Sequence, residues 1–162
     1  MKQKFINAYM KVAKTFADLS YARRLHVGAI VVKDDRIISI GFNGMPSGWD
    51  NDCENIEYTY DERDTVDGGW TYNKDNKQWS RLKTKPEVLH AEMNALMKLA
   101  KSNESGLDSS IFITHSPCLD CAKGIYQAGI KEVYYSTDYR STDGIDFLNK
   151  CGITVTRVKE GE

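Results

Sequence analysis

Residues 110–135 read SIFITHSPCLDCAKGIYQAGIKEVYY, and this segment carries the clearest secondary-structure signals in the chain. The run Ser110–Thr114 predicts a buried strand, the segment from Pro117 to Gly129 predicts a helix, and Lys131–Tyr135 predicts a second strand. Because proline has no N–H to lose at the first position of a helix, we expect Pro117 to begin this one. A strand, a helix and a strand in this order indicate an α/β fold.

The flanking segments extend this pattern. Two β-branched runs, Val27–Lys33 and Arg36–Phe42, are separated only by two aspartates and predict an antiparallel hairpin. The other expected elements are a first helix with the apolar stripe Phe5, Tyr9, Val12, Phe16 and Leu19, a helix over Ala91–Ser102 with Met93, Leu96, Met97 and Ala100 on one face, a helix around Ile145–Cys151, and a strand over Ile153–Val158. Together they predict a three-layer α/β/α domain around a mixed sheet.

Composition narrows the class of protein. The 162 residues hold 22 Lys plus Arg against 23 Asp plus Glu, a net charge of −1, and 41% hydrophobic residues, which is typical of one globular domain over residues 1–162. The sequence contains no run of 18 apolar residues, and its first residues do not lead into an apolar stretch followed by a small-residue cleavage site. We therefore expect no export signal and a cytoplasmic protein without a membrane partner. Nucleic-acid binding normally requires a basic face, whereas this chain has a net charge of −1, so we expect no nucleic-acid partner.

A long insertion, at about residues 47–88, interrupts the alternation of strands and helices. Asp50–Asp67 holds eight acidic residues and one basic residue, whereas Lys74–Lys85 holds five basic residues and one acidic residue. Loops of this length in compact domains are usually functional or contain a small structure of their own. We therefore expect a partly ordered surface excursion that pairs its own charges.

Two short motifs carry the chemistry. His90-Ala91-Glu92 stands at the start of one predicted helix, and Pro117-Cys118-Leu119-Asp120-Cys121 opens another. Ligation by His90, Cys118 and Cys121 would leave the fourth tetrahedral position of a zinc ion open, as in catalytic sites. The combined pattern is that of zinc-dependent nucleobase deaminases, in which the glutamate, here Glu92, moves protons as general acid and base. The predicted reaction is hydrolytic deamination.

A structural zinc knuckle and a redox pair are the alternatives for the two cysteines. A structural zinc site needs a fourth ligand, and the remaining candidates, Cys53, Cys151, His26 and His115, have no paired spacing to either motif. We therefore favour the catalytic zinc and expect Cys151 in the core. A zinc-binding module without enzyme activity would instead have a closed site with four ligands.

The similarity extends beyond the zinc residues. Five segments carry it: 27–32 VGAIVV, 41–46 GFNGMP, 90–95 HAEMNA, 116–122 SPCLDCA and 127–133 QAGIKEV. In these segments the chain resembles the deoxycytidylate deaminases of the zinc-dependent cytidine deaminase superfamily. The resemblance implies a cytidine-deaminase-like fold with a five-stranded sheet, one catalytic zinc per subunit and a homohexamer. It also implies that dCMP is deaminated to dUMP for thymidylate synthesis, with dCTP as activator and dTTP with Mg²⁺ as inhibitor.

The resemblance assigns roles to further residues. Asn43 would hydrogen-bond a sugar hydroxyl, the backbone at Ala91 and Ser116 would hold the pyrimidine edge, and Tyr139 would lie near the pyrimidine. For Asn43 the alternative is a residue of an Asn-Gly turn, and for Tyr139 it is a surface tyrosine. The segment Gly44, Met45 and Pro46 would contribute to the effector site.

The phosphate of the substrate requires cations near the sugar, and Arg23 and Arg24 supply them just before the first strand. Related sequences have an Asp-Pro-containing loop in this place, so the sequence leaves open which arginine contacts the substrate. Two arginines could also hold a longer phosphate chain, so a deaminase acting on dCTP as well as dCMP is the alternative. Some relatives carry a second zinc in the insertion, but this chain has only Cys53 and no histidine there, so we expect one zinc.

Overall fold

The centre of the molecule is a five-stranded sheet of order β2-β1-β6-β7-β8, seen in a computed structural model that describes residues 1–159. Its strands are β1 (Gly28–Lys33), β2 (Arg36–Phe42), β6 (Ser110–His115), β7 (Glu132–Thr137) and β8 (Thr154–Arg157). β1 is antiparallel to β2 and β6, whereas β6, β7 and β8 are parallel. The mixed sheet is therefore confirmed. The last three residues of the domain predicted over 1–162 lie outside the described range.

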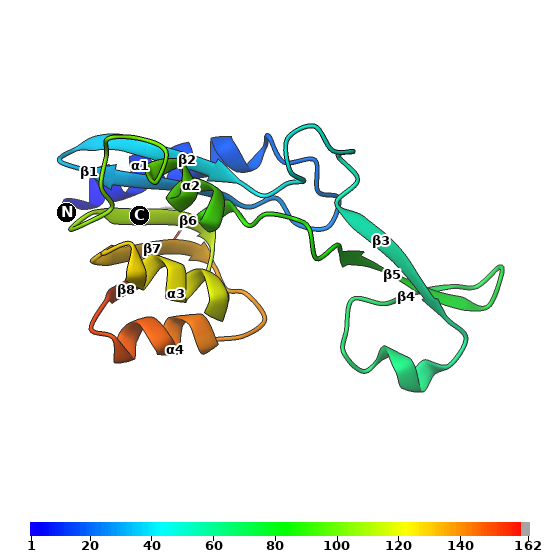
Figure 1. Cartoon of the computed structure of the whole chain (residues 1–162). Coiled ribbons are helices and arrows are strands. Elements are labelled where there is room, and N and C mark those ends of the chain that lie inside the picture. Colours follow the sequence, from blue (N-terminus) through cyan, green and yellow to red (C-terminus); the bar gives the residue numbers. More distant parts are fainter. Residues whose placement is uncertain (160–162) are drawn as a thin grey trace.

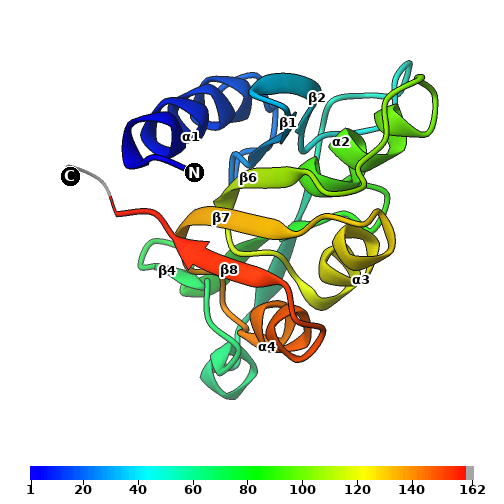
Figure 2. The same cartoon turned by 90° about the vertical axis from the view of Figure 1, so that its left-hand side faces the viewer.

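Helices cover both faces of this sheet (Figure 2). α1 (Gln3–Ala17) packs on one face, and α2 (Ala91–Leu99), α3 (Leu119–Gln127) and α4 (Asp143–Lys150) lie on the other. Side chains alternate along each strand, so Ile30 and Phe112 join the α1 core, whereas Val31 and Ile113 join the core under the other three helices. This alternation produces the predicted three-layer α/β/α architecture.

The apolar face of α1 differs by one position from the predicted one. The helix buries Ile6, Met10, Ala13 and Ala17, whereas Phe5 is 41% exposed and Leu19, just beyond the helix, is 52% exposed. The cause is a close approach to β1: a Cβ at Gly28 would lie 2.0 Å from the carbonyl oxygen of Ala13. Only small side chains fit at this approach, where Ala13 and Ala17 lie, whereas the larger Tyr9, Val12 and Phe16 are only partly buried against the same core.

Three other local expectations are corrected. α3 begins at Leu119, so Pro117 lies two residues before the helix and Cys118 is the N-cap. α2 ends at Leu99, and Met97 is half exposed because the face toward the sheet carries Ala91, Ala95 and Leu96. Cys151 is only partly buried. The hairpin is confirmed, and its two aspartates have φ values of 49° and 58°, as a tight two-residue turn requires.

The insertion forms a small antiparallel sheet of its own. It contains β3 (Glu54–Thr59), the 3₁₀ helix η1 (Glu62–Thr65), β4 (Thr71–Asn73) and β5 (Gln78–Thr84), in the order β3-β5-β4. This arm projects away from the main sheet (Figure 1). Glu57 pairs with Arg81 and Lys83, Arg81 also pairs with Asp67, and further pairs join Asp52 to Lys85 and Asp61 to Arg63. The insertion thus does pair its own charges.

Among residues 1–159, none of the helices combines the length and the apolar character needed to cross a bilayer.

Candidate metal centre and active site

The two sequence motifs meet where two helices begin. His90 is the N-cap residue of α2, Cys118 is the N-cap residue of α3, and Cys121 lies in the first turn of α3. β6 delivers its carboxyl end to the same place, because His115 is the last residue of that strand and three residues later α3 is capped. Ligand sites of α/β sheets commonly lie at the carboxyl ends of strands.

The side chains of His90, Cys118 and Cys121 form a compact cluster. The His90 Nδ1 atom lies 3.6 Å from Cys118 Sγ and 3.4 Å from Cys121 Sγ. All three candidate ligand atoms lie within 4.8 Å of one another, and no other group of three His, Cys, Asp or Glu residues in the range 1–159 meets this condition. One nitrogen and two sulfurs at this spacing are a zinc-binding donor set.

The electrostatics of the cluster fit a divalent cation. Hydrogen bonds from Cys121 and then from His90 lower the pKa of Cys118 to about 4. The pKa of Cys121 is raised, first by its hydrogen bond to the Cys118 sulfur and then by burial, and loss of its proton would place two thiolates side by side. The pKa of His90 is raised by its hydrogen bond to Cys118. A cation bound here would relieve this repulsion and would favour the thiolate form of both cysteines.

Glu92 lies beside the cluster but is not part of it. It belongs to the first turn of α2 and is only 5% exposed. Burial raises the pKa of its carboxyl group, and the Cys121 side chain hydrogen-bonds to it. A buried carboxyl group with a raised pKa holds its proton more readily than an exposed one, so it can donate a proton as well as accept one, as general acid–base catalysis requires.

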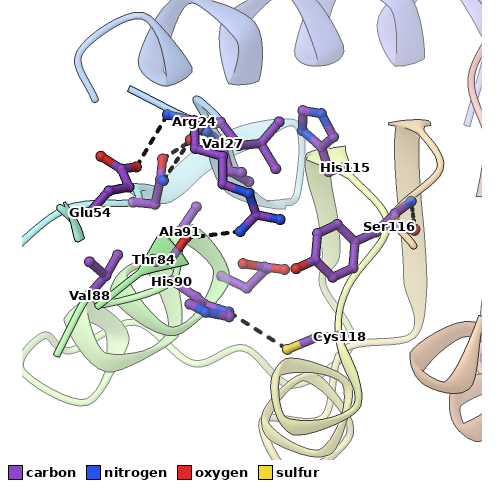
Figure 3. Close-up of a pocket in the computed structure, with 14 residues that line it drawn as sticks. Arg24, Val27, Glu54, Thr84, Val88, His90, Ala91, His115, Ser116 and Cys118 are labelled. Carbon is purple, nitrogen blue, oxygen red and sulfur yellow. Dashed lines mark hydrogen bonds between the residues drawn. The ribbon is translucent and has the colours of Figure 1, made fainter. Parts of the chain in front are cut away.

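A cavity opens over Glu92 and two of the cluster residues (Figure 3). Its lining residues are Arg24, Leu25, Val27, Asn43, Glu54, Thr84, Val88, His90, Ala91, Glu92, His115, Ser116, Cys118 and Tyr139. They come from the loop before β1, the residue after β2, both ends of the insertion, the start of α2, the end of β6 with the segment after it, and the segment after β7. Of the ten residues predicted for catalysis, zinc and substrate, eight line the cavity, and the other two, Cys121 and Arg23, do not.

Asn43 lines this cavity and also holds the loop before β1. Its Oδ1 accepts the N–H of Val27 at 2.8 Å, and its Nδ2 donates to the carbonyl of Leu25 at 2.8 Å. An amide side chain has two donor hydrogens and two acceptor lone pairs, so one of each remains for a further partner. Asn43 can therefore support the loop and contact a sugar hydroxyl at the same time.

Ser116, Ala91 and Tyr139 surround the same space. The N–H of Ser116 is already donated to the Thr137 carbonyl at 2.8 Å, and its Oγ accepts the N–H of Tyr139 at 2.7 Å. Only the Ser116 carbonyl can therefore serve a ligand from the backbone. Ala91 is the first residue of α2, where backbone N–H groups have no partner within the helix. The cavity lining thus includes one residue with a backbone N–H that has no partner within its helix and one residue whose carbonyl is its only backbone group left for a ligand.

The two predicted phosphate arginines point in different directions. The Arg24 guanidinium enters the cavity and donates to Thr84 Oγ1 at 3.0 Å. The Arg23 guanidinium turns away, donating to Asp52 Oδ1 at 2.9 Å and to the carbonyl of Glu54 at 3.0 Å. Arg23 is therefore neutralised by the insertion, whereas Arg24 faces the ligand space.

The proposed effector segment lies at the edge of the insertion. Gly44 pairs with Leu89 as an isolated β-bridge, and Met45 packs against a small cluster formed by Ala22, Cys53 and Val88. Gly44, Met45 and Pro46 are all partly buried, and none lines the cavity.

Sequence reasoning missed several groups near the cavity. Glu54 and Thr84 come from the two ends of the insertion, and no local signal connects them with the zinc motifs. His115 precedes Ser116 directly and could have been included on that ground; burial lowers its pKa. Arg140 donates to the Tyr139 hydroxyl at 3.4 Å and lines an adjoining depression together with Arg24. Arg140 directly follows Tyr139, a predicted substrate residue, and could have been included on that ground.

This combination of fold and site defines a class, the zinc-binding enzymes with a cytidine-deaminase-like fold. Comparison with known proteins agrees: residues 3–137 match the family model described as cytidine and deoxycytidylate deaminase zinc-binding region. The chain belongs to this family.

The relatives include named deaminases. The deoxycytidylate deaminase of Enterobacteria phage T4 is 32% identical over 164 residues, covering 82% of this chain and 78% of the phage protein. The human deoxycytidylate deaminase is 36% identical over 153 residues, covering 90% of this chain and 75% of the human protein. Among solved structures, the dCMP deaminase of cyanophage S-TIM5 in complex with dCMP and dUMP matches with a TM-score of 0.79 and 46% identity, over 98% of this chain and 99% of the phage chain.

Proposed function

We propose that this protein is a dCMP deaminase, which hydrolyses the exocyclic amino group of dCMP to give dUMP and ammonia. The observation that carries the proposal is the placement of Glu92, which is buried next to the His90, Cys118 and Cys121 cluster and lines a cavity that Arg24 also lines. The identity to the S-TIM5 enzyme, described in complex with dCMP and dUMP, supports the choice of substrate.

His90, Cys118 and Cys121 would hold one catalytic zinc per subunit, with Nδ1 as the donor atom of His90 because that nitrogen faces both sulfurs. When bound, zinc supplies Lewis-acid activation of water. Glu92 would take a proton from the attacking water and deliver it to N3 of the pyrimidine, so that C4 becomes electrophilic. The water oxygen would bond to C4, and Glu92 would then move the proton of this new hydroxyl group to the amino nitrogen. The C4–N bond breaks, ammonia departs, and the oxygen on C4 becomes the carbonyl oxygen of dUMP.

The rest of the cavity would orient the nucleotide. The Ala91 N–H and the Ser116 carbonyl would hold the pyrimidine edge, Tyr139 would lie near the ring, and the remaining valences of Asn43 would hold a sugar hydroxyl. Arg24 is the better candidate for the phosphate than Arg23, because Arg23 is paired with Asp52.

We propose the regulatory properties of the resemblance as part of the same function. The product dUMP would feed thymidylate synthesis, dCTP would activate, and dTTP with Mg²⁺ would inhibit at a site that includes Gly44, Met45 and Pro46 in a homohexamer. Support comes from the GFNGMP segment and from Gly44 bridging Leu89, the residue before the ligand His90. An effector bound there would lie one residue from the metal centre.

Use of dCTP as well as dCMP is the alternative that one observation favours. The depression next to the cavity is lined by the cations Arg24, Lys83 and Arg140 among others, which offers room and charge for further phosphates. Comparing turnover of dCMP and dCTP by the same protein preparation distinguishes the two substrate ranges.

Replacing Glu92 by glutamine tests the proposal. The amide cannot carry a proton, so we expect zinc content and melting temperature to be retained while release of ammonia from dCMP falls about 10³-fold, within the range of general acid–base catalysis. Zinc is measured by atomic emission and dUMP by chromatography. A zinc-binding module without enzyme activity predicts the opposite, namely that wild type and Glu92→Gln are equally inactive with dCMP, with or without dCTP and Mg²⁺.

A further inference from the structure

Glu54 is a buried carboxylate that the proposed reaction does not use. It is the first residue of β3, at the point where the chain enters the arm, and its side chain is 1% exposed. It nevertheless lines the catalytic cavity together with Arg24 and Thr84 (Figure 3). Burying a carboxylate is costly unless hydrogen bonds compensate it, so its partners indicate what it does.

Both carboxylate oxygens of Glu54 bind the backbone of the loop before β1. Oε2 accepts the N–H of Arg23 at 3.0 Å, and Oε1 accepts the N–H of Arg24 at 3.2 Å. Residues 20–27 lie outside every helix and strand, so side-chain contacts of this kind determine the path of the loop. Of the ordinary side chains, a carboxylate is the best suited to accept two adjacent N–H groups at once.

The other end of the arm holds the side chain of the same arginine. Thr84, the last residue of β5, accepts a hydrogen bond from Arg24 Nη1 at 3.0 Å and is the ladder partner of Glu54. Glu54 therefore fixes the backbone at Arg24, and Thr84 fixes its guanidinium. The Arg23 guanidinium instead donates a hydrogen bond to Asp52, and Arg23 does not line the cavity. The two ends of the insertion thus place one arginine inside the cavity and the other outside.

We propose that Glu54 is a positioning residue for nucleotides that carry a 5′-phosphate. It acts through Arg24, whose backbone it fixes so that the guanidinium can reach Thr84 and the cavity, and it gives the insertion a part in substrate selection. The inference rests on the proposed function, because it takes the phosphate of dCMP as the group that Arg24 meets.

Glutamine at position 54 keeps the shape of the side chain but turns one acceptor oxygen into an NH₂ group, which opposes one of the two backbone N–H groups. For Glu54→Gln we expect the KM for dCMP to rise about tenfold, the value of one charge-assisted hydrogen bond, with kcat within about twofold of wild type. Calorimetry is expected to show about tenfold weaker binding of dUMP and unchanged binding of deoxyuridine, which lacks the phosphate.

The matched control is Glu57→Gln. Glu57 lies on the same strand and pairs with Arg81 and Lys83, but it does not line the cavity. Its replacement is expected to leave dUMP binding unchanged. Thr84→Val provides a milder version of the same loss, about threefold in dUMP affinity, and keeps the test available if Glu54→Gln does not fold.

Arg24→Gln completes a double-mutant cycle. Because Glu54 is proposed to act through Arg24, Glu54→Gln is expected to have no further effect on dUMP binding in the Arg24→Gln background. An undiminished effect there, or equal weakening of dUMP and deoxyuridine binding, overturns the proposal and leaves the deaminase assignment intact. Failure of the wild type to deaminate dCMP overturns the proposed function, whereas the positioning role is judged by dUMP binding.

Discussion

At the residue scale, two cysteines of identical chemistry differ only in their surroundings. Cys118 meets His90 Nδ1 and Cys121 at the start of a helix, whereas Cys151 lies beyond the end of α4 and takes no part in the ligand cluster. Oxygen is a poorer zinc ligand than thiolate sulfur at such a site. Replacing Cys118 by serine therefore tests the metal centre, and the same replacement at Cys151 is the matched control.

We predict that Cys118→Ser lowers zinc content from about one ion per chain to near zero after dialysis, with a parallel loss of activity. Cys151→Ser is expected to retain both. Zinc and protein are quantified on the same sample, by emission spectroscopy and amino-acid analysis. Two ions per chain in the wild type, or full zinc content in Cys118→Ser, would contradict the single His/Cys/Cys site.

The ligand cluster could be predicted from the sequence because its information is local. His90 and Glu92 lie within three residues, and Cys118 and Cys121 lie within one turn, so spacing alone identifies the donor set. Glu54 and Thr84 could not be predicted in this way. They reach the cavity through the pairing of β3 with β5, a contact between residues 30 positions apart that no periodicity announces.

At the element scale, the position of α2 depends on a residue in a neighbouring strand. A Cβ at Gly41, in β2, would lie 2.1 Å from the carbonyl oxygen of Ala91 and 2.6 Å from the backbone nitrogen of Ala95. Both atoms belong to the α2 backbone and cannot rotate away. The absence of a side chain at Gly41 thus lets the helix that presents His90 and Glu92 rest directly on the sheet.

Gly41→Ala is therefore predicted to push α2 from the sheet, at a cost of about 1–3 kcal/mol in the free energy of unfolding. Zinc affinity is expected to fall as well, because His90 caps the displaced helix. Gly44→Ala is the control, since a Cβ there meets no atom within 4 Å. Urea unfolding and competition with a zinc chelator measure the two effects; equal midpoints for both variants would refute this account of the packing.

Two predictions about the elements were wrong or missing, and a glycine contact of this kind explains the first. Periodicity predicted that α1 exists, but the buried face shifted because Gly28 brings β1 against Ala13. The three strands of the arm were missed because they are mostly polar, and a strand such as QWSRLKT has no apolar alternation to recognise. Cross-strand pairs such as Glu57 with Arg81 join these strands, and the partners become known only when the register is known.

At the scale of the whole molecule, the arm and the core are stabilised by different forces. The core is held by two apolar clusters on either face of the main sheet. The arm relies on ion pairs: Arg81, and then Trp70, lower the pKa of Asp67 to about 2, and Lys83, followed by Arg81, lowers the pKa of Glu57. Acid should therefore act on the two parts at different pH values.

We predict that the arm loosens as the pH falls from about 4 toward 2. Carboxylates whose pKa is depressed by folding stabilise the folded form above their ordinary pKa, and this stabilisation is lost as the pH falls through the folded value. All three tryptophans, Trp49, Trp70 and Trp79, lie between residues 49 and 79, so tryptophan emission reports on the insertion. Far-UV circular dichroism follows the helices of the core.

Asp67→Asn is expected to move the fluorescence transition to higher pH without moving the dichroism transition, because it removes a carboxylate partner of Arg81 in advance. A single transition seen by both probes, unaffected by this substitution, would show that arm and core unfold as one unit. High salt is expected to weaken the arm in the same direction as acid, since exposed ion pairs are screened.

The ladder that joins Glu54 to Thr84 has one more consequence. Two paired strands lie about 5 Å apart whatever the length of chain beyond them. The two segments that connect the arm to the core therefore keep a fixed spacing. The outer hairpin of the arm, where β4 turns into β5, is therefore a place where foreign sequence can be grafted without displacing the catalytic groups. An epitope or a fluorescent peptide inserted there would be displayed on the arm, away from the main sheet.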